Sequence, residues 1–535
     1  MPPPPSPRPP RSPVRVAVDM SHLRPGGENG GVKPFLFETL LWLGRQQVAP
    51  LRFSYLTCAS THAEVRDGLA RVQDEVICVR PDEGATPESD SQAPRERLCV
   101  PPPLDLIELL GADMLYCPFG PVDFAVPGIG TISMVVDVLH RDFPWTLPPA
   151  HNAARETVFQ EIVAKADRLQ CISWHVVGRM QAHYDVPAAR CFTTHIAIHE
   201  RFAAMPLAPE RMPDGDADPE EKPAPFFFYP ANAWKHKNHE SLLLAYGIYH
   251  AGERAAGRVP WPLVLTGHEE ARWQELRALA ATLDLLRDDA VQFRGYVPPG
   301  EYGRIWDTAG ALVFPSLHEG FGIPLVEAMQ HDLPVLTGSD GSLREVGADA
   351  CLYADARRPL ALAEAMTRLA GDAALRADLI ARGRRRRADF SLARESGHLL
   401  DAILHLAHHG PDGRAGTKGV FPDGWTEGLA LFALPSATGG DAAPVRLTLC
   451  FHPLPAPRRV RLRVGRSVAL GTFDLPAFRT DNEIVLATRP GGGSLRMEVL
   501  DAANLDPDDA RLHGVHLQSI VVRLGDGREH ILFAA

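Results

Sequence analysis

The sequence lacks long apolar runs, paired cysteines and an excess of positive charge, and each shortage excludes a class of protein. No stretch approaches the roughly 18 consecutive apolar residues that a membrane-spanning helix needs. The net charge is −11, from 55 basic and 66 acidic residues, which disfavours a protein that wraps nucleic acid. None of the eight cysteines forms a C-x-x-C pair or clusters with histidine at zinc spacing. We therefore expect reduced, buried thiols in a cytoplasmic protein.

The length and the proline distribution predict several domains. With 535 residues, 45% of them hydrophobic, the chain is long enough for two to four domains with cores of their own. Residues 1–13 are proline-rich without an apolar core, so we expect an unordered tail and no secretory signal. Residues 206–225 and 407–419 hold little to bury and are expected to be linkers. The folded segments are then residues 14–205, 226–406 and 420–535.

The first two folded segments alternate between strand-like and helix-like runs. Val14–Asp19 is followed by a glycine-rich loop, GGENGG, and by an apolar-periodic helix near residues 33–45, which together open a βα unit. Further strands are expected at residues 114–117, 131–136, 168–172, 226–229, 262–266, 291–293, 311–314 and 333–336. This alternation predicts an α/β fold with a parallel, doubly wound sheet in each segment.

The last folded segment has a different character. Residues 420–535 show short alternating strands, such as those at residues 445–449, 460–464 and 495–499, with glycine, proline and asparagine turns and no helical period. This pattern predicts an all-β sandwich.

The stretch SLHEGFGIPLVEAM carries the strongest chemical signal. It follows a strand, Gly320 and Gly322 allow a tight turn close to a ligand, and Pro324 suits the first turn of a helix. Amides at such a helix start favour an anion such as a diphosphate. Glu319 and Glu327 bracket the turn and suit hydrogen bonding to the vicinal hydroxyls of a ribose and a sugar. Spacing alone leaves a solvated glutamate pair equally open.

Two weaker signals follow buried strands. Lys235 and Lys237 come after the first strand of the second segment, where doubly wound folds bind phosphates. A solvated basic loop is the alternative, but the chain has only six lysines against 49 arginines, which favours a function. Asp137 and His140 follow a strand of the first segment and are expected to line the cleft, although a lone histidine is more often structural.

Together these stretches resemble retaining glycosyltransferase family 4, of mannosyltransferase-like type. Glu319 and Glu327 match the family's EX7E pattern, and YPANAWKHKNH, VVDVLHRDFPW and GGENGG resemble its diphosphate, acceptor-side and glycine-loop segments. The resemblance covers about residues 14–406. It implies the GT-B architecture, in which two Rossmann-like domains face each other across a cleft, the first for the acceptor and the second for a nucleotide sugar.

The resemblance also implies roles for single residues. Glu327 would bind the ribose, Glu319 the donor sugar, and Lys237 the diphosphate with Lys235 nearby. Asp137 and His140 would face the reacting sugar and the acceptor. The remaining nucleotide-sugar contacts would come from the glycine loops and the helix start, at Gly30, Gly31, Gly320, Phe321, Gly322, Leu325 and Val326.

Two positions depart from the family pattern. Asn232 stands where many relatives carry arginine, so the diphosphate would meet one fewer cation, and Val136 stands where many carry histidine. We expect His140 to take the role of that missing histidine. If no residue takes it, acceptor activation is in doubt.

The expected activity is therefore transfer of a hexose, with mannose favoured, from a GDP- or UDP-linked donor to a glycan or lipid-linked saccharide. Such a retaining transferase would act in bacterial cell-surface polysaccharide biosynthesis and would need no metal and no cofactor besides its donor substrate. A catalytically silent nucleotide-sugar or glycan-binding scaffold and a GT-B sugar-nucleotide epimerase are the alternatives. The oligomeric state is left open.

Two further segments suggest binding surfaces. The arginine run at residues 384–387 would suit anionic lipid at the inner face of a membrane, although a solvated helix face explains it more simply. FPDGW and LDPDDARLHGVHLQSIVV resemble the β-sandwich modules appended to some polysaccharide glycosyltransferases, and Trp425 suggests a glycan-binding or docking role. A packing module is equally open.

Overall fold

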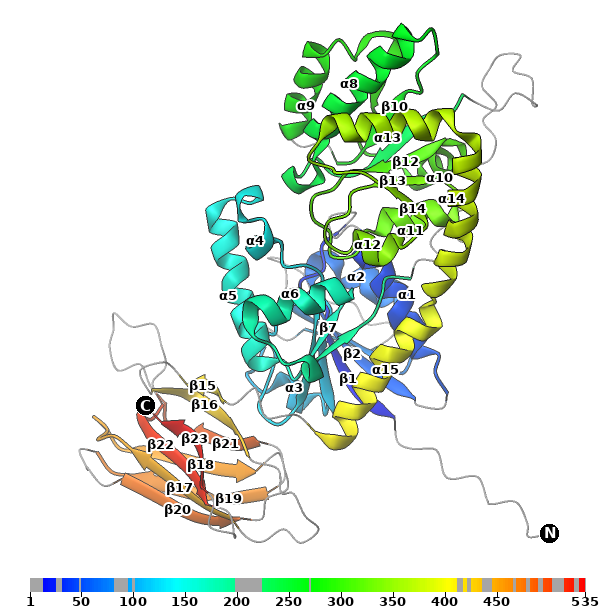
Figure 1. The fold of residues 1–535 in the computed structure, drawn as a ribbon. Helices are drawn as coiled ribbons and strands as arrows, with labels where there is room; N and C mark the ends of the chain where they lie inside the picture. The colour runs from blue at the N-terminus through cyan, green and yellow to red at the C-terminus, as the bar shows by residue number, and fades with distance from the viewer. Residues whose placement is uncertain are drawn as a thin grey trace, which may run out of the picture.

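Three folded units follow one another along the chain in the computed structural model (Figure 1). The structure describes residues 13–25, 31–47, 50–80, 95–98, 102–197, 224–268, 271–410, 417–420, 425–434, 445–464, 468–477, 482–488, 494–502, 514–523 and 529–534. Most of the predicted tail, most of the first predicted linker, residues 411–416 of the second and Gly30 lie outside these residues. The ends of the second predicted linker are not linker, because residues 407–409 belong to a helix and residues 417–419 to a strand.

The first unit is built on an eight-stranded sheet in which every pairing is parallel, in the order β4-β3-β2-β1-β5-β6-β7-β8. Its strands are β1 (Val14–Asp19), β2 (Leu51–Cys58), β3 (Glu75–Arg80), β4 (Arg95–Leu98), β5 (Met114–Cys117), β6 (Gly130–Val135), β7 (Arg168–Cys171) and β8 (Cys191–Thr193). The helices are α1 (Val32–Gly44), α2 (Ala59–Gly68), α3 (Leu106–Leu109), α4 (Leu139–Asp142), α5 (Pro149–Lys165) and α6 (Trp174–Tyr184). The strand order reverses between β1 and β5.

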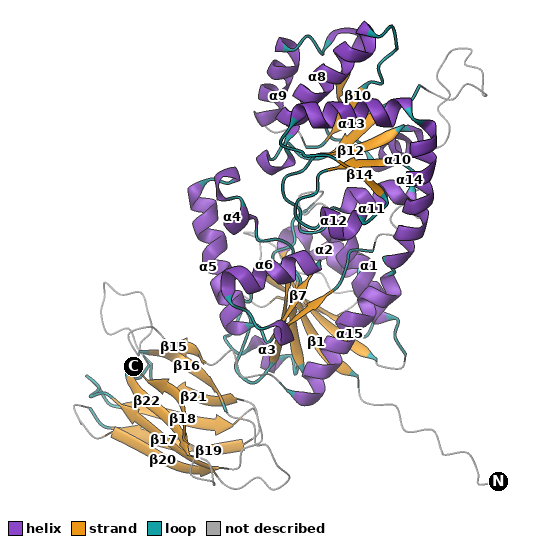
Figure 2. Ribbon diagram, in the orientation of Figure 1, coloured by secondary structure: helices purple, strands orange, loops and turns teal. Residues whose placement is uncertain are grey.

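The second unit repeats this design with a six-stranded parallel sheet, ordered β11-β10-β9-β12-β13-β14. Its strands are β9 (Phe227–Pro230), β10 (Leu263–Thr266), β11 (Val291–Phe293), β12 (Ala311–Phe314), β13 (Val335–Thr337) and β14 (Cys351–Tyr353). The helices are α8 (His239–Ala255), α9 (Ala271–Thr282), α10 (Pro299–Thr308), α11 (Ile323–Gln330), α12 (Leu343–Gly347), α13 (Pro359–Gly371) and α14 (Ala373–Arg386). Helices cover the sheet (Figure 2), so its strands are continuous apolar runs.

The next helix, α15 (Leu392–His409), returns to the first unit. Its residues Leu399, Ile403 and Leu406 are buried in one cluster with side chains of β1, β2 and α1. The predicted domain end at residue 406 is therefore wrong in two ways, because the helix continues to His409 and packs on the other unit. We call residues 13–197 with α15 the first lobe, and residues 224–391 the second lobe.

The remaining described residues form an all-β module, as predicted. Its strands are β15 (Thr417–Val420), β16 (Thr426–Ala433), β17 (Val445–Phe451), β18 (Arg458–Val464), β19 (Val468–Leu475), β20 (Asn482–Thr488), β21 (Ser494–Val499), β22 (Leu517–Arg523) and β23 (Glu529–Ala534). They form two antiparallel sheets, β15-β16-β21-β18-β19 and β20-β17-β22-β23, which share one apolar core. Alternating burial along β18 shows how each strand contributes every second side chain to that core.

The module is attached to the first lobe through buried charges. Arg496 of β21, whose side chain is 9% exposed, donates to Asp105 at 2.6 Å and to Glu108 of α3 at 2.5 Å. Ser494 also donates to Glu108, at 2.5 Å. Leu431 of β16 is buried in the same apolar cluster as first-lobe side chains. The contact is thus both apolar and ionic.

The structure bears on two predictions made from composition, which concern the cysteines and membrane-spanning helices. The seven described cysteines are free thiols; four of them are buried, whereas Cys58, Cys191 and Cys450 are partly exposed. Among the helices that the structure describes, none combines the length and apolarity needed to cross a bilayer.

Candidate active site between the two lobes

The candidate site lies where the strand order of the second sheet reverses. β9 and β12 are neighbours there, and the loops after them are tied together. The Leu317 amide and the Ser316 hydroxyl donate to the His236 carbonyl oxygen at 2.8 and 3.2 Å. The Asn238 side chain donates to the Pro315 carbonyl oxygen at 3.1 Å. Two loops 80 residues apart in sequence therefore form one surface, at the point where open α/β sheets bind ligands.

This surface brings together Lys237 and Glu319. The Lys237 ammonium lies 2.6 Å from a Glu319 carboxylate oxygen, and the two side chains are only 14% and 12% exposed. Tyr229 donates its hydroxyl hydrogen to the Lys237 carbonyl oxygen at 2.5 Å, which fixes the loop. Lys235, by contrast, is exposed. Because the two side chains are this close, one ligand could contact both Lys237 and Glu319. Their roles toward a donor stay predictions.

The start of α11 has the tight turn that its glycines predict. Gly322, at φ +94°, precedes the helix, and Pro324 lies in its first turn. The Leu325 amide donates to the Gly322 carbonyl oxygen at 3.0 Å, so the turn itself uses the amide that the resemblance assigned to a phosphate. Glu327 is 2% exposed. The Phe321 ring packs against the rings of Phe390 and His195, which leaves its backbone for the predicted contact.

Glycines bring the two lobes into contact at this turn. A Cβ atom on Gly31 would lie 2.5 Å from the Ile323 side chain at the start of α11, so the first-lobe loop contacts this helix start, and its role toward a phosphate stays a prediction. A Cβ atom on Gly320 would collide with the Val136 carbonyl oxygen at the end of β6. Ser173, at the start of α6, donates to the Gly320 carbonyl oxygen at 2.6 Å.

A Gly320→Ala substitution is therefore expected to force the lobes apart. Displacement of reacting groups by about 1 Å can cost roughly 10²-fold in rate, and we expect a loss of that order in kcat. Gly303→Ala on α10 is the matched control, because no atom lies within 4 Å of its added methyl group. The check is kcat together with the radius of gyration in solution, and equal kcat values for the two variants would contradict the expected clash.

Asp137 lies at the lobe boundary, on the first-lobe side. Its carboxylate pairs with Arg155 of α5 and accepts from the Leu139 amide at 2.9 Å. Burial alone would raise the pKa of Asp137, but the Arg155 guanidinium, the Leu139 amide and the second-lobe imidazoles of His318 and His236 together lower it. Asp137 is therefore a stable anion close to second-lobe side chains.

His140 does not occupy the position expected for it. A hydrogen bond of 2.7 Å joins its Nε2 to the Tyr184 hydroxyl, and its ring centroid lies 4.6 Å from that of Phe159. The residue is 4% exposed and enclosed by first-lobe side chains. It packs inward because the short helix α4 turns it toward α5 and α6. The prediction that His140 replaces the missing histidine at Val136 is therefore not supported by this placement.

Sequence reasoning missed two second-lobe histidines that approach Asp137. His318 directly precedes Glu319, and His236 lies between the two lysines, so both stood inside the singled-out motifs. Burial and the Lys237 charge lower the pKa of His236 to about 3, so it is neutral at ordinary pH. Asn232, which stands where many relatives carry arginine, accepts from the His268 amide through its side chain at 2.9 Å. It joins the loops after β9 and β10.

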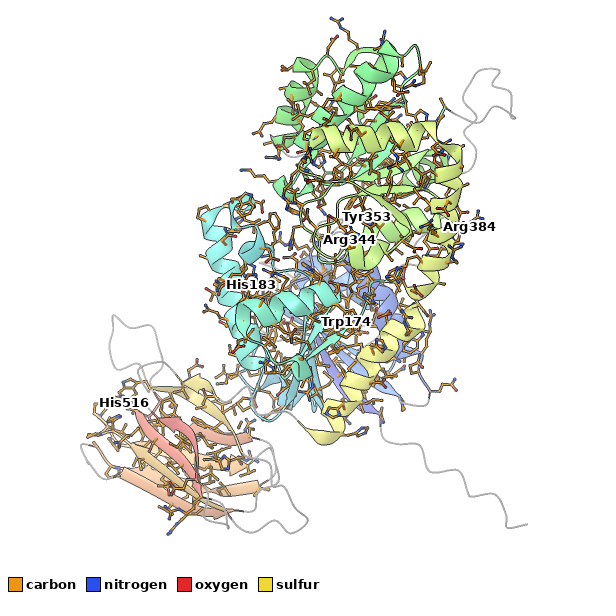
Figure 3. The ribbon with its side chains drawn as sticks, in the orientation of Figure 1. Trp174, His183, Arg344, Tyr353, Arg384 and His516 are labelled. Carbon is orange, nitrogen blue, oxygen red and sulfur yellow. The ribbon has the colours of Figure 1, made fainter. Side chains whose placement is uncertain are left out.

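An ionic contact joins the lobes near the start of α6. Glu345 of α12 accepts from the Trp174 and His175 amides, each at 2.8 Å, and thereby caps the first turn of α6. Figure 3 labels Trp174 on this helix. His195 lies 2.8 Å from Glu345, and its amide donates to Glu395 of α15 at 2.8 Å. Burial would lower the pKa of His195, but the two carboxylates outweigh it and raise the pKa to about 9.

This contact predicts a loss of stability at alkaline pH. The His195 pKa rises from 6.5 to about 9 on folding, so its contribution is complete below about pH 6.5 and disappears as pH increases through 9. The Glu345 and Glu395 pKa values are lowered, so their contributions remain above pH 4.5. We expect a decrease of roughly 2 to 3 kcal/mol in the free energy of unfolding between pH 6 and 10. His195→Asn should flatten that slope in denaturant titrations; an unchanged slope would contradict the assignment.

The two other segments that the sequence suggested as binding surfaces, the arginine run and the region of Trp425, make contacts within the protein. In the arginine run, Arg384 pairs with Asp332 at 2.8 Å, Arg386 donates to the Glu345 carbonyl oxygen at 2.6 Å, and Arg387 donates to the Met329 carbonyl oxygen at 3.1 Å. These contacts hold α14 on the second lobe. In the module, the Trp425 ring stacks on His516 with centroids 4.9 Å apart.

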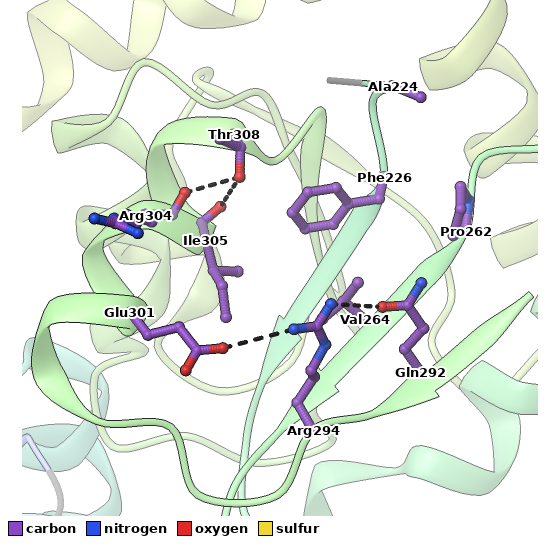
Figure 4. A pocket seen from close by; sticks show the side chains of 10 residues that line it. All are labelled: Ala224, Phe226, Pro262, Val264, Gln292, Arg294, Glu301, Arg304, Ile305 and Thr308. Atoms are coloured by element: carbon purple, nitrogen blue, oxygen red, sulfur yellow. Dashed lines mark hydrogen bonds and ion pairs between the residues drawn. The ribbon is translucent and has the colours of Figure 1, made fainter. Parts of the chain in front are cut away.

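A pocket of about 330 Å³ opens elsewhere in the second lobe, between α10 and strands β9 to β11 (Figure 4). Phe226 and Pro262, which directly precede β9 and β10, line it, so it extends toward the starts of these strands. Lys237 and Glu319 follow the opposite ends. The pocket is therefore separate from the candidate site.

The two facing α/β lobes define the GT-B fold that the sequence predicted. A glycosyltransferase from Rickettsia africae has the same fold, with a TM-score of 0.52 and 12% identity over 74% of this chain and 99% of that one. Residues 215–386 match the family model described as glycosyl transferases group 1. The second lobe thus contains a glycosyl transferase group 1 domain, and it holds Lys237, Glu319 and α11.

Two curated relatives from Escherichia coli match parts of the chain. O-antigen chain mannosyltransferase B is 33% identical over 123 residues, which are 22% of this chain and 30% of the relative. The serotype-specific mannosyltransferase WbdA is 28% identical over 263 residues, which are 48% of this chain and 31% of the relative. The chain therefore spans about a third of the length of these relatives.

Proposed function

We propose that the protein is a retaining glycosyltransferase of family 4 that moves a hexose from a GDP- or UDP-linked donor to a glycan or lipid-linked saccharide. The observation that carries this proposal is the Lys237–Glu319 contact of 2.6 Å, within the region that matches glycosyl transferases group 1. The O-antigen mannosyltransferase relatives favour mannose and a place in cell-surface polysaccharide biosynthesis.

In the proposed reaction, Lys237 exchanges partners when the donor binds. A diphosphate carries more charge than the Glu319 carboxylate and would attract the Lys237 ammonium, which frees Glu319 for the sugar hydroxyls. Lys237 then stabilises the departing diphosphate while positive charge develops at the anomeric carbon. Asp137, kept anionic by Arg155, would face that positive charge. Glu327 would bind the ribose, and contact between the lobes would exclude water.

The proposal is tested with the purified full chain and a panel of GDP- and UDP-hexoses. With GDP-mannose and a mannose-terminated saccharide, we expect release of GDP and a new linkage with the anomeric configuration of the donor, read by NMR. Binding without GDP release across the panel would favour the silent scaffold. Conversion of the donor sugar without an acceptor would favour the epimerase.

A further inference from the structure

A partly exposed and a buried imidazole meet at the lobe boundary next to Glu319. His175 belongs to the first turn of α6, His318 to the loop before α11, and their ring centroids lie 6.2 Å apart in an edge arrangement. His318 is 4% exposed. On both rings, Nε2 is buried and has no hydrogen-bond partner among the described residues. Because an unpaired buried polar atom is costly, the two atoms point to a missing ligand.

Asp142 of the first lobe lies beside His318. One Asp142 oxygen is bound by Arg179 and His183 of α6, at 2.8 and 2.7 Å. The other lies 3.7 Å from Nδ1 of His318. The carboxylate therefore faces Nδ1, and Nε2 on the far side of the ring is left for a ligand.

The charge state of the imidazoles indicates the kind of ligand. Burial lowers the pKa of both His175 and His318 and so favours the neutral form, in which one ring nitrogen donates and the other accepts. A hydroxyl group both donates and accepts, and neutral imidazoles match it well. A phosphate would instead be bound by a cation such as Lys237.

Aromatic rings extend this surface. The Phe143 ring lies 5.4 Å from His318, and the Trp145 ring lies 5.0 Å from Phe143. Trp145 is 67% exposed, so its ring is accessible to a ligand. An apolar shelf with a few fixed polar atoms is typical of sites for small polar ring molecules.

We propose that His175, His318, Phe143 and Trp145 form a subsite for a neutral pyranose ring, with hydroxyls on the two imidazoles and the ring face on the aromatic side chains. This inference rests on the proposed function for its biological meaning. The pyranose is the sugar of the donor or the terminal residue of the acceptor, and the two sources give different kinetics.

The test compares His318→Gln and Trp145→Ala with Trp174→Ala in the full chain. Trp174 is a matched control, because it is 62% exposed in the same lobe and lies next to His175. Loss of one hydrogen bond or one stacking contact corresponds to about tenfold in affinity. An acceptor subsite predicts a tenfold higher KM for the acceptor with unchanged donor hydrolysis. A donor subsite predicts slower hydrolysis with unchanged binding of GDP or UDP.

Two outcomes would overturn the proposal. The first is that both variants match Trp174→Ala in transfer, in hydrolysis and in calorimetric titration with methyl α-mannopyranoside. The second is stoichiometric Zn²⁺ binding that His318→Gln abolishes while sugar binding stays intact, which would make Asp142, His175 and His318 a metal site. If the wild-type protein shows no turnover, the proposed function fails, and the titration still decides whether the subsite binds a pyranose.

Discussion

Replacing Lys237 with methionine is expected to lower kcat by about 10² to 10³-fold, since removal of one preorganised electrostatic group from an active site has effects of that size. The substitution removes the charge 2.6 Å from Glu319 and leaves that carboxylate largely buried without its counter-ion. The measurement is the release of nucleoside diphosphate at saturating donor concentration. Binding of GDP or UDP, followed by thermal shift, should weaken as well.

Two other lysine variants make this result specific. Lys235→Met removes an equal charge two residues away, but that side chain is exposed, so we expect a much smaller effect on kcat. Lys165→Met on α5 removes a surface partner of Glu161 and should leave kcat unchanged. Equal losses of kcat in Lys235→Met and Lys237→Met would mean that the reaction depends on the positive charge of this loop as a whole, and not on the contact between Lys237 and Glu319.

The Arg496→Met substitution is expected to detach the C-terminal module from the first lobe. It would leave the Asp105 and Glu108 carboxylates, 6% and 10% exposed, without their shared cation. Removal of one partner from a buried ion pair typically destabilises by about 3 to 5 kcal/mol. We expect this loss to exceed the free energy that holds the module on the first lobe. Small-angle scattering should then show a larger radius of gyration with both lobes still folded.

A surface pair in the same sheet provides the comparison. Arg459 pairs with Asp474 at 3.0 Å, but both side chains are well exposed, so Arg459→Met should change stability by less than about 1 kcal/mol and leave the radius unchanged. If Arg496→Met also keeps the module attached, then the apolar contact around Leu431 is sufficient for docking.

The sequence revealed the bounds of β1, β5, β11 and β12. In β5 and β12, every residue is buried, and continuous apolar runs mark such strands. The strand β2 was not predicted because polar residues interrupt its sequence, LRFSYLTC, and β4 was not predicted because three of the four residues in RERL are charged. In β2 and β4, pairing with neighbouring strands outweighs the local residue pattern. A single sequence does not show that pairing.

In the candidate site too, some contacts could be predicted from the sequence and others could not. The contact between Lys237 and Glu319 follows from topology, because loops after adjacent parallel strands meet at one edge. The approach of His318 to Asp142 depends on the angle between two lobes, and no local pattern encodes that angle. The inward turn of His140 was missed because helix α4 has only four residues and thus no readable period.

The return of α15 to the first lobe bears on how the chain is made. Leu399, Ile403 and Leu406 complete a core whose other members are found as early as Val16. A ribosome must therefore release the whole second lobe before the lobe translated first can close its apolar surface. We expect a fragment ending before residue 392 to aggregate, and a synthetic peptide spanning α15 to rescue it.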